Sequence, residues 1–168
     1  MHRRLSAKNG RPVTDVTEFR VGGQKLYLSP ILDLYNGEII AFKTAMRPLL
    51  DMVGAMLRQA FERLRPRDKP ILHSDQGWQY RMPIYRRVLN ERAVKPSMSR
   101  KGNCYDNAAM ESFFGTLKSE FFYLNKFNSL DELEAGIEDY IHYYNHSRIR
   151  LKLSGLSPVE YRTQARRA

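Results

Sequence analysis

The sequence of 168 residues contains one cysteine, Cys104, and no long apolar run. A single thiol excludes an internal disulfide framework and any zinc or iron–sulfur site built from several cysteines. No stretch approaches the roughly 20 apolar residues that a membrane span needs, and the basic start at residues 1–4 is not followed by the apolar segment of a signal peptide. We therefore expect a protein of the reducing cytoplasm with no membrane partner.

Internal repeats and low-complexity tracts are also missing. Hydrophobic residues make up 42% and charged residues 27% of the chain, which is ordinary globular usage and argues against disorder. A chain of this length builds one domain and is too short for two ordinary domains and a linker. We predict a basic N-terminal extension over residues 1–12, a core domain over 13–147 and a basic C-terminal segment over 148–168.

Acidic residues are scarce at both ends of the chain. Of the formal charge of +10, residues 1–11 contribute +4 and residues 145–168 contribute +5, which leaves +1 for everything between. Within that middle part, residues 81–101 hold seven basic side chains and one acidic one, Glu91. Nucleic acid is the natural partner, because phosphate neutralisation and counterion release dominate its binding. A charge retained for solubility is the alternative that composition leaves open.

Hydrophobic periodicity predicts an α/β domain with helices on a mixed five-stranded sheet. Asn36-Gly37 is a strong hairpin signal, and Ser129 begins a capping box that starts a long helix. The first three strands form an antiparallel meander, and the last two are short and buried. The expected strands cover residues 13–21, 25–34, 38–42, 70–73 and 93–98, and the expected helices cover 49–61, a segment beyond 84, 104–122, a segment from Ser129 and a short one from Ser157.

Three carboxylates lie where a rigid scaffold offers side chains to a ligand. Asp15 is in the middle of the first predicted strand, where an acid is disfavoured unless it has a partner. Asp75 follows the apolar strand over 71–73, so its carboxylate projects from the carboxyl end of a strand, where open α/β sheets bind ligands. Glu111 faces away from the buried stripe of its helix. All three are candidate functional acids.

The outward face of that helix aligns Asn107, Gly115 and Lys118 with Glu111. Gly115 costs about 1 kcal/mol of helix stability relative to alanine. A close approach of a DNA backbone is one reason for its missing side chain, with Lys118 binding a phosphate. A solvated helix face with an incidental glycine is the alternative.

Three longer segments resemble the catalytic blocks of bacterial insertion-sequence transposases of the orfB type, which have a retroviral-integrase-like core with a D-D-E motif. The blocks are residues 14–19 (TDVTEF), 73–77 (HSDQG) and 106–113 (DNAAMESF), and 35 residues separate Asp75 from Glu111. Residues 26–33, 97–103 and 155–161 are also similar to that family. The resemblance covers nearly everything from Val13 onward.

The resemblance implies an RNase H-like fold and metal-dependent DNA cleavage and strand transfer by residues 13–147. It implies that Asp15, Asp75 and Glu111 are catalytic and bind two Mg²⁺ or Mn²⁺ ions. Carboxylates suit such hard cations, and a pair of ions stabilises both the entering and the leaving oxygen of a phosphoryl displacement. The implied partners are element ends and target DNA, bound by a homo-oligomer at the bacterial nucleoid. The candidate DNA-binding residues are Lys118, Asn107, Arg100, Lys101, Arg148, Arg150 and Lys152.

The chain departs from the family pattern before its first block. Fourteen residues precede Asp15, too few for the helix-turn-helix that family members usually carry, and residues 9–13 lack the tryptophan that commonly sits there. We therefore expect a truncated reading frame or one product of a split gene. Two other functions stay open: a non-catalytic DNA-binding remnant, and an RNase H-like nuclease, which the basic C-terminal segment and Lys118 disfavour.

Other polar residues have structural explanations that we prefer. His142 and His146 have the spacing of a zinc pair, but no third ligand is recognisable. His73 is expected to orient or pack rather than bind a metal, and Asp33 is expected to be a partly exposed structural acid. Trp78 could stack on a base, and a half-buried loop anchor is the preferred interpretation.

Overall fold

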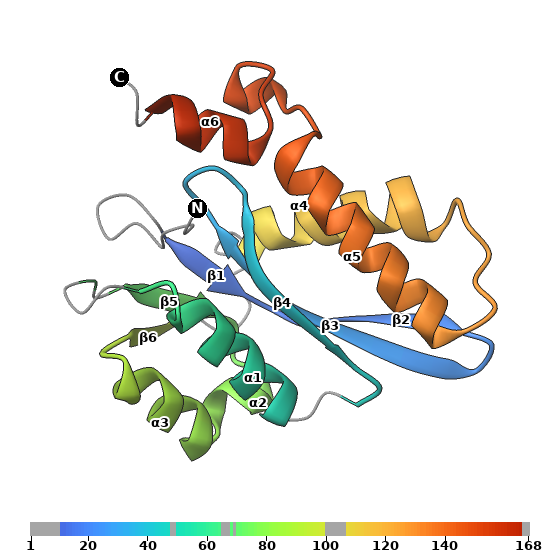
Figure 1. The fold of residues 1–168 in the computed structure, drawn as a ribbon. Helices are drawn as coiled ribbons and strands as arrows, with labels where there is room; N and C mark the ends of the chain where they lie inside the picture. The colour runs from blue at the N-terminus through green and yellow to red at the C-terminus, as the bar shows by residue number, and fades with distance from the viewer. Residues whose placement is uncertain (1–10, 48–49, 65–67, 69, 100–106, 166–168) are drawn as a thin grey trace.

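A mixed β-sheet runs through the middle of the protein (Figure 1). The structure is a computed structural model that describes residues 11–47, 50–64, 68, 70–99 and 107–165. Its strands are β1 (Pro12–Thr14), β2 (Thr17–Val21), β3 (Gln24–Asp33), β4 (Ile39–Ala45), β5 (Ile71–Ser74) and β6 (Lys95–Met98).

The helical elements follow the predicted order, with two additions, the short helix α2 and the 3-10 turn η3. None of the described helices is long and apolar enough to cross a membrane. They are α1 (Leu50–Phe61), α2 (Trp78–Arg81), α3 (Pro83–Glu91), α4 (Ala108–Leu117), the π-helical turn η2 (Lys118–Phe122), α5 (Leu130–His146), the 3-10 turn η3 (Leu151–Leu153) and α6 (Pro158–Ala165).

The sheet has the predicted combination of antiparallel and parallel strands. β3 pairs antiparallel with β4 and, on its other side, with both β1 and β2. β5 is parallel to β1, and β6 is parallel to β5. The sheet is six-stranded rather than five-stranded only because the first predicted strand is divided into β1 and β2.

The division falls at Asp15 and Val16, where a continuous strand was predicted. Thr14 pairs with Ile31 and Thr17 with Leu28 in one unbroken register, so Asp15 lies opposite Pro30. Proline has no N–H to donate to the ladder. The Val16 N–H, for its part, donates to the Asp15 carboxylate at 2.8 Å. The interruption therefore coincides with a proline on the neighbouring strand, and it frees the first candidate acid from the regular ladder.

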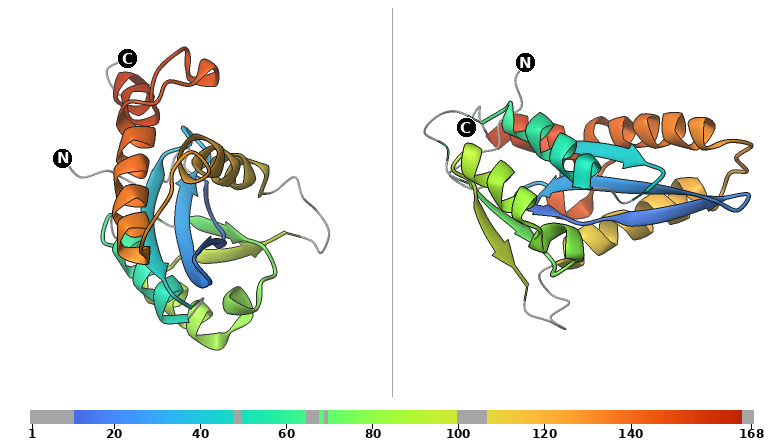
Figure 2. Two further views of the ribbon diagram at one scale, coloured as in Figure 1. Left: turned by 90° about the vertical axis from the view of Figure 1, so that its right-hand side faces the viewer. Right: turned by 90° about the horizontal axis from the view of Figure 1, so that it is seen from below.

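Helices cover both faces of the sheet (Figure 2). Neighbouring residues of β3 point to opposite faces, so that Ile31 belongs to one hydrophobic core and Leu32 to the other. Helices α1 to α3 pack on the Ile31 face, and α4 and α5 pack on the Leu32 face. The sheet is thus the middle layer of three, and its strand ends emerge between the two helical layers.

The predicted serine cap at Ser129 is present, and Ser157, predicted to begin the last helix, has a capping box. Ser129 Oγ accepts a hydrogen bond from the Glu132 N–H at 3.1 Å at the start of α5. At the start of α6, the Ser157 N–H donates to Glu160 Oε2 at 2.8 Å and Ser157 Oγ accepts from the Glu160 N–H at 3.4 Å. The polar residues at these positions therefore define where the last two α-helices begin.

The C-terminal segment folds back onto the β3–β4 turn. Arg162 of α6 is buried, pairs with Asp33, and lies 3.5 Å from Glu38 Oε2. Asn36 binds the same arginine at 3.1 Å and donates to the Pro158 carbonyl at 2.7 Å. Asp33 is indeed structural, but the prediction that it is partly exposed is wrong, since its exposed fraction is 0%. The arginine that neutralises it is 129 residues away in sequence.

Candidate active site

Asp15 lies at the break between β1 and β2 and is half-buried. Burial raises its pKa to about 6; the hydrogen bond from the Val16 N–H opposes the rise, and the charges of Asp75 and Glu111 add to it. An acid in this state gives up its proton near neutral pH, more readily if a cation comes to lie beside it.

Asp75 emerges at the same edge of the sheet as Asp15. Val13 of β1 and His73 of β5 are partners on adjacent parallel strands, and each acid follows its strand partner by two residues. Asp75 Oδ1 accepts a hydrogen bond from the Gly77 N–H at 2.7 Å. A Cβ at Gly77 would come within 2.9 Å of that oxygen, so glycine permits this tight turn. The predicted position at the carboxyl end of a strand is confirmed.

Glu111 is exposed in the first turn of α4, on the Leu32 side of the sheet. The buried side of α4 carries Met110, Phe113, Phe114 and Leu117, which leaves Glu111 on the outward side as predicted. Its charge acts on Asp15. The three acids, from a strand, a strand end and a helix, therefore form one electrostatic group.

Nothing in the described part of the chain neutralises this group. The ion pairs formed among the described residues involve none of Asp15, Asp75 and Glu111. Among the same described residues, no three histidine, cysteine or acidic side chains are already gathered closely enough to hold an ion. The donor chemistry fits a hard divalent cation, while closure of the ligands around an ion requires further approach of the side chains.

Tyr80 of α2 lies beneath the two aspartates and was missed by the sequence analysis. Its side chain is fully buried and packs edge-on against Tyr85 with ring centroids 5.3 Å apart. Burial raises the pKa of Tyr80, and the charges of Asp15 and Asp75 raise it further. The hydroxyl is therefore close enough to sense both acids. A helix of four residues is too short to produce a periodic pattern, which is why α2 was not predicted.

The residues predicted to align with Glu111 differ in their surroundings. Gly115 is exposed, and a Cβ there would meet nothing within 4 Å. Lys118 is partly buried, with Nζ 5.4 Å from the centre of the Phe19 ring. Asn107 is not on the solvated face: it is buried at the N-cap of α4, and its Oδ1 has no hydrogen-bond donor among the residues that the structure describes.

The other predicted DNA-binding cations fall into three groups. Arg100 and Lys101 lie outside the described residues. Arg148 binds Glu120, and Arg150 donates to the Tyr144 hydroxyl at 3.1 Å, so both guanidinium groups have partners within the protein. Lys152 is exposed in η3.

The alternative polar residues are placed as follows. The rings of His142 and His146 stack with centroids 4.4 Å apart, and no group of three metal-binding side chains forms around them among the described residues. His73 Nδ1 is 3.0 Å from Ser97 Oγ, which agrees with a packing role. Trp78 starts α2 rather than lying in a loop, and it is 48% exposed.

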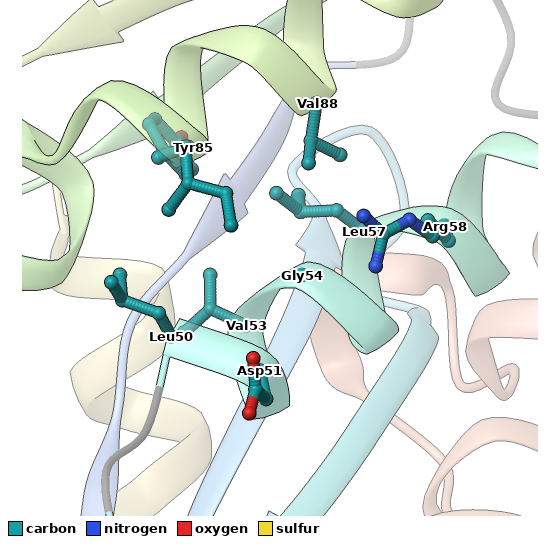
Figure 3. A pocket seen from close by; sticks show the side chains of 9 residues that line it. Leu50, Asp51, Val53, Gly54, Leu57, Arg58, Tyr85 and Val88 are labelled. Carbon is teal, nitrogen blue, oxygen red and sulfur yellow. The ribbon is translucent and has the colours of Figure 1, made fainter.

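A separate hollow lies between α1 and α3. Figure 3 shows Val53 and Leu57 of α1 facing Tyr85 and Val88 of α3. None of the three acids lines it. This apolar hollow is therefore distinct from the candidate active site.

Comparison with known families and proteins agrees with this geometry. The family described as "Integrase core domain" matches residues 6–104, and a second family of the same description matches residues 111–165. The putative transposase InsK for insertion sequence element IS150 of Escherichia coli is 58% identical over 93% of this chain and 55% of its own length. An uncharacterized transposase-like protein of Haemophilus influenzae is 55% identical over 94% of this chain and 72% of its own.

Solved structures share the fold. The HTLV-2 integrase catalytic core domain in complex with magnesium superposes with a TM-score of 0.72 at 17% identity, over 95% of this chain and 99% of that one. The catalytic core domain of BIV integrase gives a TM-score of 0.64 at 13% identity, over 92% and 95%. The RNase H-like architecture predicted from the sequence is confirmed.

The chain spans 55% of the Escherichia coli relative and 72% of the Haemophilus influenzae relative. Each relative carries an insertion-sequence or transposase name, and the family match covers the strands and helices that hold the three acids. The chain therefore belongs to the integrase core domain family and is similar to bacterial insertion-sequence transposases.

Proposed function

We propose that this chain is a DNA strand-transfer core in which Asp15, Asp75 and Glu111 are the catalytic acids. One observation carries the proposal. Asp15 and Asp75 follow the Val13–His73 pair of adjacent parallel strands by two residues each, and the charge of Glu111 reaches the same point. None of the three acids has a described counter-charge, whereas buried structural acids are normally paired, so a divalent cation is the proposed partner.

Two divalent ions, Mg²⁺ or Mn²⁺, are the proposed cofactors, held by the same three side chains. When bound, they supply Lewis acidity to the entering and leaving oxygens of a phosphodiester. The protein's own contribution is orientation. The Gly77 N–H holds Asp75 Oδ1, and the Val16 N–H holds Asp15 Oδ1. Because a backbone hydrogen bond fixes one oxygen of each carboxylate, the direction of the other oxygen is fixed as well.

DNA is the proposed substrate, as element ends and as target. Lys118 lies seven residues after Glu111, two turns further along the same helical face, and is the cation best placed beside the acids. Lys152, Arg100, Lys101 and Asn107 are further proposed contacts. The proposed working form is a homo-oligomer assembled on DNA at the nucleoid.

The test is DNA nicking and joining on a duplex that carries element-end sequence, with and without Mg²⁺ or Mn²⁺. Asp75→Asn and Glu111→Gln should each abolish the divalent-dependent products, while DNA binding persists. Asp51→Asn, which changes an exposed acid of α1, is the matched control and should leave them unchanged. Activity that needs no divalent ion would contradict the proposal.

A second candidate is a DNA-binding protein without catalysis. The observation that favours it is that no three described side chains are already gathered around an ion position. It predicts salt-sensitive DNA binding that Asp75→Asn and Glu111→Gln do not affect, together with no cleavage at any metal concentration. Calorimetric titration of the chain with Mn²⁺ separates the two, since only the catalytic candidate requires binding that Asp75→Asn weakens.

A further inference from the structure

Lys118 begins an unusual turn of the backbone. The five residues from Lys118 to Phe122 form a π-helical turn, closed by a hydrogen bond of 2.8 Å from the Tyr123 N–H to the Lys118 carbonyl. Such turns are rare and appear frequently at functional sites. Phe122, the last residue of the turn, packs edge-on against Phe19 with centroids 5.0 Å apart, and the Lys118 ammonium lies over that same Phe19 ring. The position of the lysine head group thus depends on how this turn is seated.

A polar clamp joins the turn to the C-terminal end of α5. Glu120, two residues after Lys118, accepts hydrogen bonds from Arg148 Nε at 2.9 Å and from Arg148 Nη2 at 2.6 Å. The Tyr140 hydroxyl donates to the same carboxylate at 2.7 Å. Hydrogen bonds from Arg148, the largest cause, and from Tyr140 lower the pKa of Glu120. A two-pronged contact of this kind fixes direction as well as distance.

Aromatic packing seats the turn on α5 as well. The Phe121 ring stacks on Tyr140 with centroids 5.8 Å apart. Gly136 lies one helical turn before Tyr140, and a Cβ there would overlap the Phe121 ring. Because glycine destabilises a helix interior, its presence in α5 is explained by this close approach. Two consecutive residues of the turn, Glu120 and Phe121, therefore converge on one segment of α5.

Arg148 uses one edge of its guanidinium group to bind Glu120. Its side chain is only 26% exposed, and Nε and Nη2 are bound to Glu120, which leaves Nη1 and the second N–H of Nη2 for any other partner. A phosphate would have to use that remaining edge of a largely covered side chain, whereas the contact with Glu120 is already formed. Lys152 differs, because it is exposed and no described acid pairs with it.

We infer that Arg148 is a positioning residue: acting through Glu120 and with Tyr140, it holds the π-helical turn that presents Lys118 to DNA, and it makes no phosphate contact of its own. This inference rests on the proposed function, since it assumes that Lys118 contacts DNA. It changes the role expected for Arg148 from a contact in a basic segment to a clamp between η2 and α5.

The experiment is a double-mutant cycle on DNA affinity, measured by fluorescence anisotropy with a short labelled duplex at low salt. Lys118→Ala is expected to weaken binding about tenfold, as for a lost charged hydrogen bond. Arg148→Ala should weaken it to a similar extent, and the double variant should be no weaker than either single variant, because both changes remove the same contact. Lys152→Ala is the control and should combine additively with Lys118→Ala.

Two variants that leave Arg148 in place separate a clamp from a direct contact. Tyr140→Phe removes one hydroxyl and no charge, and Glu120→Gln removes a negative charge. A clamp predicts weaker DNA binding for both, whereas a phosphate-binding Arg148 predicts no change for Tyr140→Phe and tighter binding for Glu120→Gln. Thermal unfolding of each variant, compared with wild type, confirms that the domain is folded.

The possible failures are distinguishable. If the unmodified chain does not bind the duplex, the proposed function is wrong and the inference fails with it. If the chain binds and Lys118→Ala has no effect, only the inference fails. If the losses of DNA affinity for Lys118→Ala and Arg148→Ala are additive, Arg148 contacts DNA directly and the inference is wrong.

Discussion

Two groups of acids in this domain have opposite electrostatic surroundings. Asp33 and Glu38, at the β3–β4 turn, are fully buried and share Arg162 as their counter-charge. Asp15 and Asp75, at the strand ends, are less buried. Glu111 adds a third negative charge that acts on Asp15, and no cation among the described residues forms an ion pair with these acids. Buried charge is tolerated in the first group because it is paired and hydrogen-bonded.

The difference separates carboxylates with a structural role from those for which we propose a catalytic role. The paired acids anchor α6 to the sheet. Burial raises the pKa of Asp15, and the charges of Asp75 and Glu111 add to the rise, so an ionised Asp15 carries an electrostatic cost. A cation bound there would relieve that cost, as the proposed chemistry requires.

The largest expected effect breaks the paired group. Arg162→Met leaves Asp33 and Glu38 buried without a cation and should lower the free energy of unfolding by about 3–5 kcal/mol. Arg86→Met, at an exposed position of α3, is the control and should change it by less than about 0.5 kcal/mol. Urea denaturation followed by circular dichroism measures both. Equal values for the two variants would remove the structural role assigned to Arg162.

Changing the unpaired group should have the opposite sign. Asp15→Asn removes an acid whose pKa is raised to about 6, so it should stabilise the metal-free chain at pH 7 by up to about 3 kcal/mol. The folded state holds this proton more tightly than the unfolded state. The cost of the charge is therefore absent below about pH 4 and grows as the pH rises through about 6.

Unfolding of Asp15→Asn and wild type at pH 4 and pH 7, without metal, measures this prediction. The gap between them should be small at pH 4 and open by pH 7. Mg²⁺ should narrow the gap at pH 7, because binding stabilises wild type by mass action and the variant lacks a ligand. An Asp15→Asn variant less stable than wild type at pH 7 would show that Asp15 is a structural acid after all.

A smaller effect sharpens the role of α6. Ser157→Ala removes the cap that starts the helix carrying Arg162 and should cost about 1 kcal/mol of stability. Ser129→Ala removes the equivalent cap of α5 and should cost about the same. In an Arg162→Met background the Ser157 effect should shrink while the Ser129 effect persists, because only α6 has lost its anchor. Denaturation of the two cap variants, of Arg162→Met and of the two double variants tests this. If both cap effects are unchanged in the Arg162→Met background, the cap and the ion pair are independent.

The smallest effect concerns the helix that supplies Glu111. Gly115→Ala fills open space on the outward side of α4 and should raise stability by less than about 1 kcal/mol. If a DNA backbone approaches α4 closely because Gly115 has no side chain, the added methyl group should nevertheless reduce DNA joining. Gly54→Ala in α1, where a Cβ makes only ordinary contact with Arg58, is the control for stability alone. Unchanged joining by Gly115→Ala would favour the solvated face with an incidental glycine.

Local signals were sufficient for most of the architecture. The hairpin at Asn36-Gly37 and the caps at Ser129 and Ser157 depend on neighbouring residues, and each is present in the structure. The position of Asp75 at the carboxyl end of a strand was predicted from the short apolar segment before it and the polar residues that follow. The family resemblance then related Asp75 to Asp15 and Glu111, which periodicity alone could not have brought together.

Long-range contacts account for what was missed. The strand break at Asp15 lies opposite Pro30, across the sheet, and the burial of Asp33 depends on Arg162. Sequence alone presented Arg148 as one more cation in a basic segment, because its partner Glu120 is 28 residues earlier. Charge counts predict the sign of a segment but not which of its side chains are already engaged.

The ion pair between Arg162 and Asp33 also has a consequence for synthesis of the protein. The acids of the β3–β4 turn leave the ribosome well before their counter-charge, because Arg162 follows Asp33 by 129 positions. Contacts of such separation form late in folding. We expect the β3–β4 turn of the nascent chain to lack its anchor until Arg162 has been synthesised and has left the ribosome.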